Sequence, residues 1–126
     1  MKIIILGANH VSISLAENLA SEANDITLVD PDADLLREVK DRIDVGTAVG
    51  MPSYPDVLRA AGAEDADMLL AVTENDEINL VACQIAHVLF KTPKKICRLR
   101  SASYMSSEGL FSPGAIAADV VISPEQ

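Results

Sequence analysis

Residues 2–12 read Lys-Ile-Ile-Ile-Leu-Gly-Ala-Asn-His-Val-Ser, and they carry the clearest indication of the fold. An apolar run, then Gly7, then residues suited to a helix is the order in which a dinucleotide-binding βαβ unit begins. The Gly-x-Gly-x-x-Gly fingerprint of such units would place glycine at positions 7, 9 and 12, and only Gly7 is present. Asn9 and Ser12 occupy the other two positions, so the loop departs from the fingerprint where phosphates would bind.

The three glycines of the fingerprint have different tasks, so the two replacements matter unequally. The first makes the tight turn, the second lets the phosphates approach closely, and the third lets the helix pack closely on the strand. Asn9 tolerates a left-handed backbone, but we expect its side chain to fill space that a dinucleotide would use. Ser12 adds only one hydroxymethyl group. The loop is therefore predicted to bind dinucleotides weakly and to accept a shorter phosphate chain, as in AMP or ADP, more readily.

The rest of the chain alternates short apolar runs with helix-length amphipathic stretches. This alternation predicts an α/β fold, a Rossmann-like doubly wound parallel sheet of about six strands with helices on both faces. The length fits a single domain, residues 1–126. Helices are expected between the first two strands and at about residues 32–42, 53–61 and 73–90, followed by a short helix and a loop over 101–114. The strands are expected at residues 2–6, 25–29, 44–49, 68–72, 95–100 and 120–122.

Open α/β sheets bind ligands at the carboxyl ends of their strands, and Asp30 is the first candidate at that edge. It ends the second strand, 23 residues after Gly7, where an acidic side chain accepts hydrogen bonds from an adenosine ribose. An Asp before a proline can equally serve to start a helix. His10, at the start of the first helix, could donate to a phosphate as an imidazolium or remain an exposed loop histidine.

Thr73 and three neighbours, Asp76, Glu77 and Asn79, follow the fourth strand at the same edge. They are candidates for ligand contact, although capping of the next helix explains Thr73 and Asp76 adequately. On the predicted fifth strand, Arg98 and Arg100 share one face because side chains alternate with period 2. An arginine on a buried face needs an anion, which a phosphate or an acidic side chain would supply.

The composition argues against several classes of partner. A formal net charge of -9 and a pI of about 4.5 disfavour nonspecific binding to nucleic acid or anionic lipid. With two Tyr, two Phe and no Trp there are few platforms for base stacking, so no nucleic-acid partner is expected. Five of the ten basic residues fall within residues 91–100, and the lysines among them are expected to form a solvated edge. The absence of a signal peptide and of an apolar run near the ~20 residues of a membrane span predicts a cytosolic chain.

Neither the two cysteines nor the histidine of the fourth predicted helix indicates a metal site. Cys83 and Cys97 form neither a CxxC pair nor a metal-ligand spacing, so we expect two buried thiols and no metal site. His87 is interpreted as a partly buried structural histidine. The helix is expected to bury Ile78, Val81, Ile85, Val88 and Leu89.

No catalytic constellation is visible in the sequence, which indicates that the chain is not an enzyme. There is no Ser/His/Asp ordering, no cysteine with a suitable histidine base and no second domain to hold a substrate. The alternative to a non-enzymatic protein is the cofactor-binding half of a small NAD-dependent oxidoreductase that works with a separate catalytic chain. Turnover of NADH with candidate substrates would distinguish a non-enzymatic protein from such an oxidoreductase.

Several further stretches point to a family. Gly7 with its following helix, Ile26–Asp30, Leu58–Met68, Ala71–Asn79, Ile96–Arg100 and Val121–Pro124 together resemble the N-terminal KTN/RCK (TrkA-N) domains of Trk potassium-uptake regulators. The resemblance covers nearly the whole chain. Residues 61–84, Ala-Gly-Ala-Glu-Asp-Ala-Asp-Met-Leu-Leu-Ala-Val-Thr-Glu-Asn-Asp-Glu-Ile-Asn-Leu-Val-Ala-Cys-Gln, are its most specific part.

The resemblance implies binding of NAD(H) or an adenine nucleotide (ATP, ADP or AMP) in the Rossmann cleft. Asp30 would contact the ribose, Thr73 the far half of the ligand, and Arg98 the phosphate region. The phosphates would be surrounded by Gly7, Ala8, Asn9, His10 and Val11. The chain departs from the family at Asn9 and Ser12, where the family has glycine, and at Met51-Pro52, where a polar pair commonly lies near the adenine.

The resemblance also implies a regulatory subunit rather than an enzyme. Such a subunit is cytoplasmic, lies at the inner face of the cell membrane, and docks on a potassium transporter or channel subunit to gate transport. The full-length family members are homo-oligomers, and they continue with a dimerisation helix and a C-terminal lobe. We therefore expect an excised domain of residues 1–126 to associate only weakly, through apolar surface on its later helices.

Overall fold

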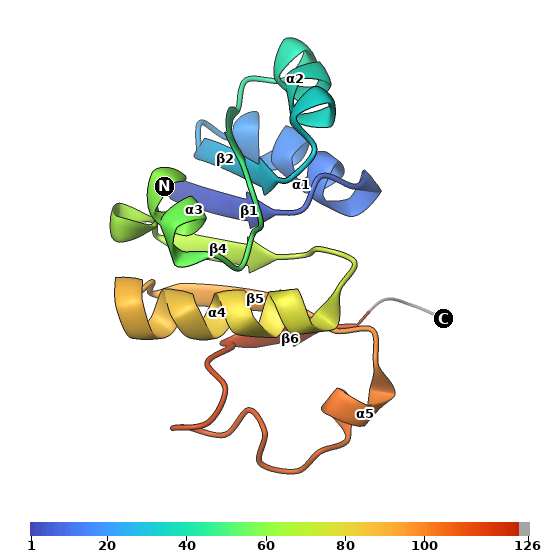
Figure 1. Cartoon of the computed structure of the whole chain (residues 1–126), viewed down its shortest axis with the longest axis vertical. Helices are drawn as coiled ribbons and strands as arrows, with labels where there is room; N and C mark the ends of the chain where they lie inside the picture. The colour runs from blue at the N-terminus through green and yellow to red at the C-terminus, as the bar shows by residue number, and fades with distance from the viewer. Residues whose placement is uncertain (124–126) are drawn as a thin grey trace.

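The computed structural model describes residues 1–123, so Pro124, the last residue of the Val121–Pro124 stretch, lies outside the described residues. It forms a six-stranded sheet in the order β3-β2-β1-β4-β5-β6, in which every neighbouring pair is parallel (Figure 1). The strands are β1 (Lys2–Leu6), β2 (Asp25–Asp30), β3 (Gly46–Val49), β4 (Met68–Ala71), β5 (Lys94–Arg98) and β6 (Val120–Ile122). The predicted Rossmann-like fold is confirmed, with strand ends shifted by one or two residues.

The helices alternate with the strands. The short α5 is followed by a long loop, as predicted for residues 101–114. The helices are α1 (His10–Ala20), α2 (Ala33–Arg42), α3 (Pro55–Ala60), α4 (Asp76–Phe90) and α5 (Ala102–Met105), with a 3-10 turn at Ala63–Asp65. No helix within residues 1–123 is long and apolar enough to cross a bilayer.

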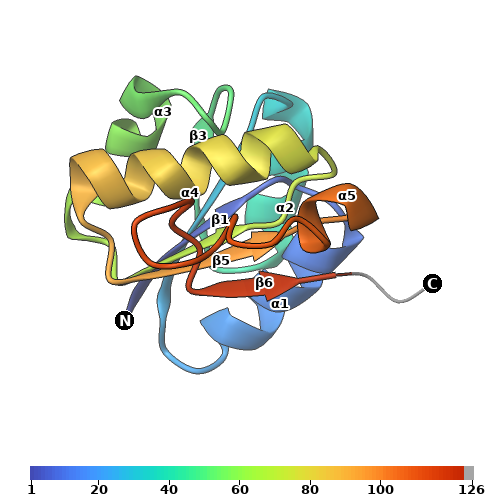
Figure 2. The same ribbon diagram turned by 90° about the horizontal axis from the view of Figure 1, so that it is seen from below.

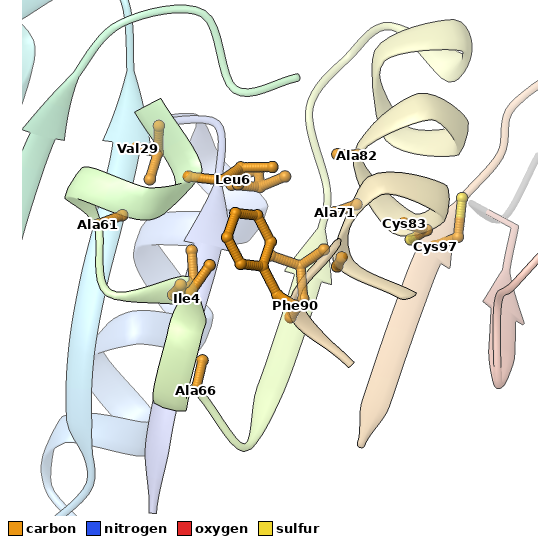
Figure 3. Packing of buried hydrophobic residues seen from close by; sticks show 14 of the residues in the cluster. Ile4, Leu6, Val29, Ala61, Ala66, Ala71, Ala82, Cys83, Phe90 and Cys97 are labelled. Atoms are coloured by element: carbon orange, nitrogen blue, oxygen red, sulfur yellow. The ribbon is translucent and has the colours of Figure 1, made fainter. Parts of the chain in front are cut away.

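β1 lies at the centre of the sheet and contributes side chains to two hydrophobic cores, one on each face of the sheet. Its side chains alternate, so Ile4 and Leu6 face one side while Ile3 and Ile5 face the other, and all four are buried. Helices α3 and α4 cover the first face, and α1 and α2 cover the second (Figure 2). Figure 3 shows the first core, where Phe90 of α4 packs near Ile4 and Leu6.

α1 packs on the sheet through small residues. Its fully buried residues are Ser12 and Ala16, whereas Val11 and Asn18 are exposed. Small side chains let the helix axis approach β1 closely, which is the task of the third glycine of the fingerprint. Ser12 therefore performs this task despite its hydroxymethyl group.

The predicted inner face of α4 is wrong. The helix buries Leu80, Cys83, Ala86 and Phe90, together with the polar Asp76 and Asn79, while Val81, Val88 and Leu89 are exposed. Ile78 and Ile85 are half-buried, and His87 is exposed rather than partly buried. The reason is that Asp76 and Asn79 turn inward to bind backbone groups, which rotates the apolar stripe toward solvent.

The expected caps also differ from those observed. Asn75, not Thr73, caps α4, and its side chain accepts a hydrogen bond from the amide of Ile78 at 2.9 Å. Pro55 occupies the first turn of α3, and the N-cap is Tyr54, without a side-chain hydrogen bond.

β5 ends at Arg98, and the chain leaves the sheet after Leu99, whose amide still donates to the carbonyl of Ile122 on β6 at 2.9 Å. The amides of Arg100 and Ser101 donate to the carboxylate of Asp76 at 2.9 and 2.8 Å. Arg98 is half-buried and Arg100 is exposed, so neither is an arginine on a buried face.

The buried cation of β5 is Lys95, which we had assigned to a solvated edge. Only 4% of the residue is exposed, and its ammonium donates to the carbonyl of Thr92 at 2.7 Å and pairs with Asp119 at 3.2 Å. Cys83 and Cys97 are buried free thiols, as predicted.

Candidate functional site

The candidate site lies at the carboxyl edge of the sheet, between β1 and β4. The chain runs from β1 to β2 on one side and returns to β4 on the other, so the helices that follow β1 and β4 cover opposite faces. An open α/β sheet has a crevice at such a switch point. Since Leu6 pairs with both Val29 and Ala71, the next residues of the three strands meet at this edge.

Gly7 makes the turn that opens the crevice. Its φ of +98° lies in the left-handed region, and a Cβ atom there would be 3.0 Å from the Cα of Thr73. Any side chain would therefore be strained and would push against the backbone of the β4–α4 loop. The amide of Gly7 donates to the carbonyl of Val29 at 2.8 Å, which fixes the turn against β2.

Asp30 holds this turn from the neighbouring strand. One carboxylate oxygen accepts from the amide of Ala8 at 2.8 Å, and the other accepts from the amide of Asp32 at 2.8 Å. A carboxylate has about four lone-pair positions, so roughly two remain for hydroxyl groups of a ligand. Asp30 is thus oriented by two backbone amides, and Asp32, not Asp30, caps α2.

The crevice contains an open space, called the hollow below, of about 330 Å³. Met51, Pro52 and Ile78 contribute apolar surface to its lining, which suits the face of a base, and Asp30 contributes a carboxylate. Its complete lining is Gly7, Ala8, Asn9, Asp30, Pro31, Met51, Pro52, Thr73, Glu74, Asn75 and Ile78.

Asn9 does not simply project into this hollow. Its side-chain oxygen accepts from the amide of Ser12 at 3.1 Å, and the Ser12 hydroxyl accepts from the amide of Asn9 at 2.8 Å, which together form a capping box. The side-chain NH₂ of Asn9 donates to the carbonyl of Val72 at 3.0 Å. Asn9 therefore caps α1 and also ties the β1–α1 loop to the end of β4.

Thr73 lines the hollow, but its polar groups are engaged by Asn79. The carboxamide oxygen of Asn79 accepts from the amide and from the hydroxyl of Thr73 at 3.0 and 2.6 Å. Its NH₂ donates to the carbonyls of Thr73 and Arg98 at 3.1 and 2.8 Å. Asn79 is fully buried, so it supports the β4–α4 loop and does not itself contact a ligand.

A second hollow, of about 400 Å³, adjoins the first beyond the β4–α4 loop and is lined by Glu74, Asn75, Asp76, Glu77, Arg100 and Ser101. Its surface is mainly acidic, with Arg100 as the cation in the lining. The Tyr104 hydroxyl donates to Glu77 at 2.7 Å, and this hydrogen bond raises the pKa of Tyr104.

The residues predicted from the sequence are only partly gathered at the hollow. Gly7, Ala8, Asn9, Asp30 and Thr73 line it, as the lining above shows. His10 lines a different hollow between α1 and α2, and neither Val11 nor Arg98 belongs to the crevice lining.

Sequence reasoning missed Ile78 and Asn75 as residues that line the crevice, whereas Arg100, considered beside Arg98 as a partner for an anion, lines the adjoining hollow. The helical position of Ile78, three residues after the cap, was available as a signal. We instead placed Ile78 on the buried face of α4.

A larger hollow, of about 880 Å³, lies at the other end of α4, between its last turns and residues 111–119. Its lining includes His87, Lys91 and the Lys95–Asp119 pair, but neither the carboxyl end of a strand nor the start of α1. The smaller crevice is the better candidate for a nucleotide because it combines a backbone-held carboxylate with the start of α1. Within residues 1–123, no group of three His, Cys, Asp or Glu side chains could hold a metal ion.

Comparison with known proteins identifies the family. The model of the TrkA-N domain matches residues 3–124. The Trk system potassium uptake protein TrkA of Halomonas elongata is 60% identical over 126 residues, which are 100% of this chain and 28% of that protein. The TrkA protein of Vibrio alginolyticus is 55% identical over 127 residues, with the same two coverages of 100% and 28%. The chain thus spans 28% of the length of these relatives.

Solved structures with low sequence identity share the fold. The TrkA-N domain of the inner membrane protein ybaL from Escherichia coli has a TM-score of 0.80 at 17% identity, over 97% of this chain and 86% of that one. The GsuK channel bound to NAD has a TM-score of 0.79 at 18% identity, over 96% and 21%. The AMP-bound Kef C-terminal domain of Shewanella denitrificans has a TM-score of 0.70 at 21% identity, over 83% and 65%. By its sequence and by its fold, the chain belongs to the TrkA-N domain family.

Proposed function

We propose that the chain is a nucleotide-sensing regulatory module of a Trk-type potassium-uptake system, with an adenine nucleotide or NAD(H) bound in the crevice after β1, β2 and β4. The observation that carries the proposal is the carboxylate of Asp30. It faces a hollow of about 330 Å³ while backbone amides already hold it in place. Ribose hydroxyls are the natural donors for such a carboxylate.

The nature of the proposed ligand is supported by the lining of the crevice and by the start of α1. An apolar side made by Met51, Pro52 and Ile78 suits a purine, and the exposed start of α1 suits a phosphate because its amides and dipole favour an anion. Structures with this fold hold NAD in the GsuK channel and AMP in the Kef domain.

The partner follows from the family and not from a surface of this chain. Relatives with 60% and 55% identity are Trk system potassium uptake proteins. We therefore propose that the full-length protein acts on a membrane potassium transporter from the cytoplasmic side. It is proposed to act without enzymatic turnover. Consumption of NADH by the chain with a candidate substrate would support the oxidoreductase alternative instead.

Calorimetric titration with NADH, NAD, ATP, ADP and AMP tests nucleotide binding. Asp30→Ala is expected to weaken binding by ~1.5–3 kcal/mol, the scale of a hydrogen bond to a charged group. Since Asp30 also holds the amides of Ala8 and Asp32, the thermal stability of each variant is measured in parallel, and Asp30→Asn serves as the milder change. Asp41→Ala, on the exposed side of α2, is the matched control. Unchanged affinity of Asp30→Ala for every nucleotide would remove Asp30 from the site.

The regulatory role requires the full-length protein. In cells that depend on the Trk system, Asp30→Ala in the full-length regulator should impair growth at low potassium, whereas Asp41→Ala should not. Equal protein levels of the two variants are verified by immunoblot. Normal growth of the Asp30 variant would contradict a regulatory role for the crevice.

A further inference from the structure

Most backbone amides of the β1–α1 loop donate hydrogen bonds to acceptors within the protein. In a phosphate-binding loop these amides point at the ligand, but here each has an acceptor in the protein: Gly7 to the Val29 carbonyl, Ala8 to Asp30, Asn9 to the Ser12 hydroxyl, and Ser12 to the Asn9 side chain. Within residues 1–123, the amides of His10 and Val11 have no such acceptor. Two adjacent amides at an exposed helix start remain for a phosphate.

The side chain of Asn9 lines the crevice and is also tied to the end of β4. Its NH₂ donates to the carbonyl of Val72 at 3.0 Å, and it lies 3.3 Å from the position that a Cβ atom on Gly7 would occupy. The hydrogen bond therefore joins the β1–α1 loop to the β4–α4 loop over Gly7. A dinucleotide must pass between these two loops, with its pyrophosphate close to the backbone at the second fingerprint position. A glycine there would leave the passage open.

We propose that Asn9 determines the ligand of the crevice, restricting it to an adenine mononucleotide with one terminal phosphate and disfavouring dinucleotides. This inference rests on the proposed nucleotide-binding function. The base and ribose occupy the hollow beside Asp30, and the phosphate ends on the amides of His10 and Val11. A mononucleotide stops on the near side of the bond between Asn9 and Val72. A dinucleotide has to break that bond and displace the carboxamide.

The charges beyond this bond act against longer phosphate chains. Glu77 lines the adjoining hollow and Glu74 lines both the crevice and that hollow, with Arg100 as the cation of the adjoining lining. A β- or γ-phosphate directed past Asn9 would approach these carboxylates, and like charges at short range repel. The same crevice thus disfavours ATP by charge and NAD(H) by obstruction, and AMP, which carries a single phosphate, is affected least.

Two substitutions separate the capping role of Asn9 from its role across the crevice. Serine at position 9 keeps a side-chain oxygen that can cap α1, but it is too short to reach Val72 and carries no NH₂. Asn9→Gly removes both interactions, at a cost to the cap of only a few tenths of a kcal/mol. Asn18→Ser, on the exposed side of α1, is the matched control.

The experiment is calorimetric titration of AMP, ATP and NADH into the chain and these three variants. We expect the unmodified chain to bind AMP at least about tenfold more tightly than NADH. Asn9→Ser and Asn9→Gly should each tighten NADH binding about 10- to 100-fold, as relief of an overfilled site would, and change AMP binding less than about threefold. Asn18→Ser should change neither.

Two results would overturn the inference while leaving nucleotide binding intact. One is NADH binding by the unmodified chain as tight as by Asn9→Gly, and the other is an equal change in AMP and NADH affinity in Asn9→Ser. Failure of every nucleotide to bind the chain and all variants would overturn the proposed nucleotide-binding function and this inference together.

Discussion

Asn79 holds Thr73 by three hydrogen bonds, to its amide, its hydroxyl and its carbonyl, and the same carboxamide reaches the carbonyl of Arg98 on β5. One fully buried side chain thus fixes the loop that forms one wall of the crevice and joins it to the next strand. This wall of the crevice is therefore positioned by the core and not by contacts at the surface.

Replacement of this side chain should be among the most damaging changes in the domain. Asn79→Leu has a similar volume, but it leaves the amide and carbonyl of Thr73 and the carbonyl of Arg98 without their partner. Each buried polar group left unpaired costs about 1–3 kcal/mol, so we expect a loss of ~3 kcal/mol or more in the free energy of unfolding. Urea denaturation measures it, with exposed Asn18→Leu as the control. A loss below about 1 kcal/mol would mean that water replaces the carboxamide.

Ser12 should contribute to the stability of the fold because its hydroxyl takes part in the capping box. Its hydroxyl accepts from the amide of Asn9 and donates to the carbonyl of Asn9, in a fully buried position. Ser12→Ala should lower the free energy of unfolding by about 0.5–2 kcal/mol, the range for loss of a cap. Thermal denaturation of Ser12→Ala beside exposed Ser14→Ala provides the comparison. Equal stability of the two variants would show that the box contributes nothing.

Stability in acid should depend on Asp119. Burial acts to raise its pKa, but hydrogen bonds from the backbone and ammonium of Lys95 outweigh burial and hold the pKa below its usual range. A carboxyl whose pKa is lower in the folded state stabilises the fold above its unfolded pKa of ~3.9, and this contribution disappears as the pH falls through the folded pKa.

Asp119→Asn should therefore reduce stability at neutral pH and flatten the loss of stability below about pH 4. Melting temperatures between neutral pH and about pH 2.5 measure this dependence, with Asp41→Asn as the control. Curves for Asp119→Asn that run parallel to those of the unmodified chain would contradict the role of the Lys95–Asp119 pair.

The exposed stripe of α4 gives a specific location for the weak association expected of this domain. Val81, Val88 and Leu89 are 47%, 53% and 53% exposed, and half-buried Ile78 and Ile85 continue the stripe. Apolar side chains gathered on one helix face favour association. At micromolar concentration, sedimentation should show mainly monomer or a labile dimer, and Val88→Lys should shift it fully to monomer, unlike Val11→Lys on α1. A tight oligomer that survives in Val88→Lys would place the interface elsewhere.

The sequence predicts the sheet well because its strands are short, apolar and separated by clear helical stretches. It also locates the turn at Gly7 and the carboxylate of Asp30, since both depend on the ends of neighbouring strands. The periodicity of α4 is misleading for a physical reason. Asp76 and Asn79 bind backbone groups inside the protein, and this requirement outweighs burial of the larger valines and leucine. Periodicity counts apolar residues and does not register a polar side chain that the core needs.

The bonds of Asn9 and Lys95 could not be predicted either. Asn9 reaches Val72, which is 63 residues away in the chain, and Lys95 pairs with Asp119, 24 residues on. Such contacts depend on the relative placement of loops after different strands, which local patterns do not specify. That Asn9 weakens the binding of dinucleotides remains a prediction. The sequence based it on the volume of the Asn9 side chain, whereas the structure bases it on the hydrogen bond between Asn9 and Val72.

Amide NMR with a titration of AMP is the decisive measurement of whether the crevice between Gly7, Asp30 and Thr73 binds an adenine nucleotide. We expect the largest chemical-shift changes at the amides of His10 and Val11, with smaller ones at Ala8 and Asp32, whose amides donate to Asp30. Resonances around the larger hollow, such as Ala117, should stay in place. Shifts confined to that larger hollow, or no shifts at millimolar AMP, would show that the crevice does not bind the nucleotide.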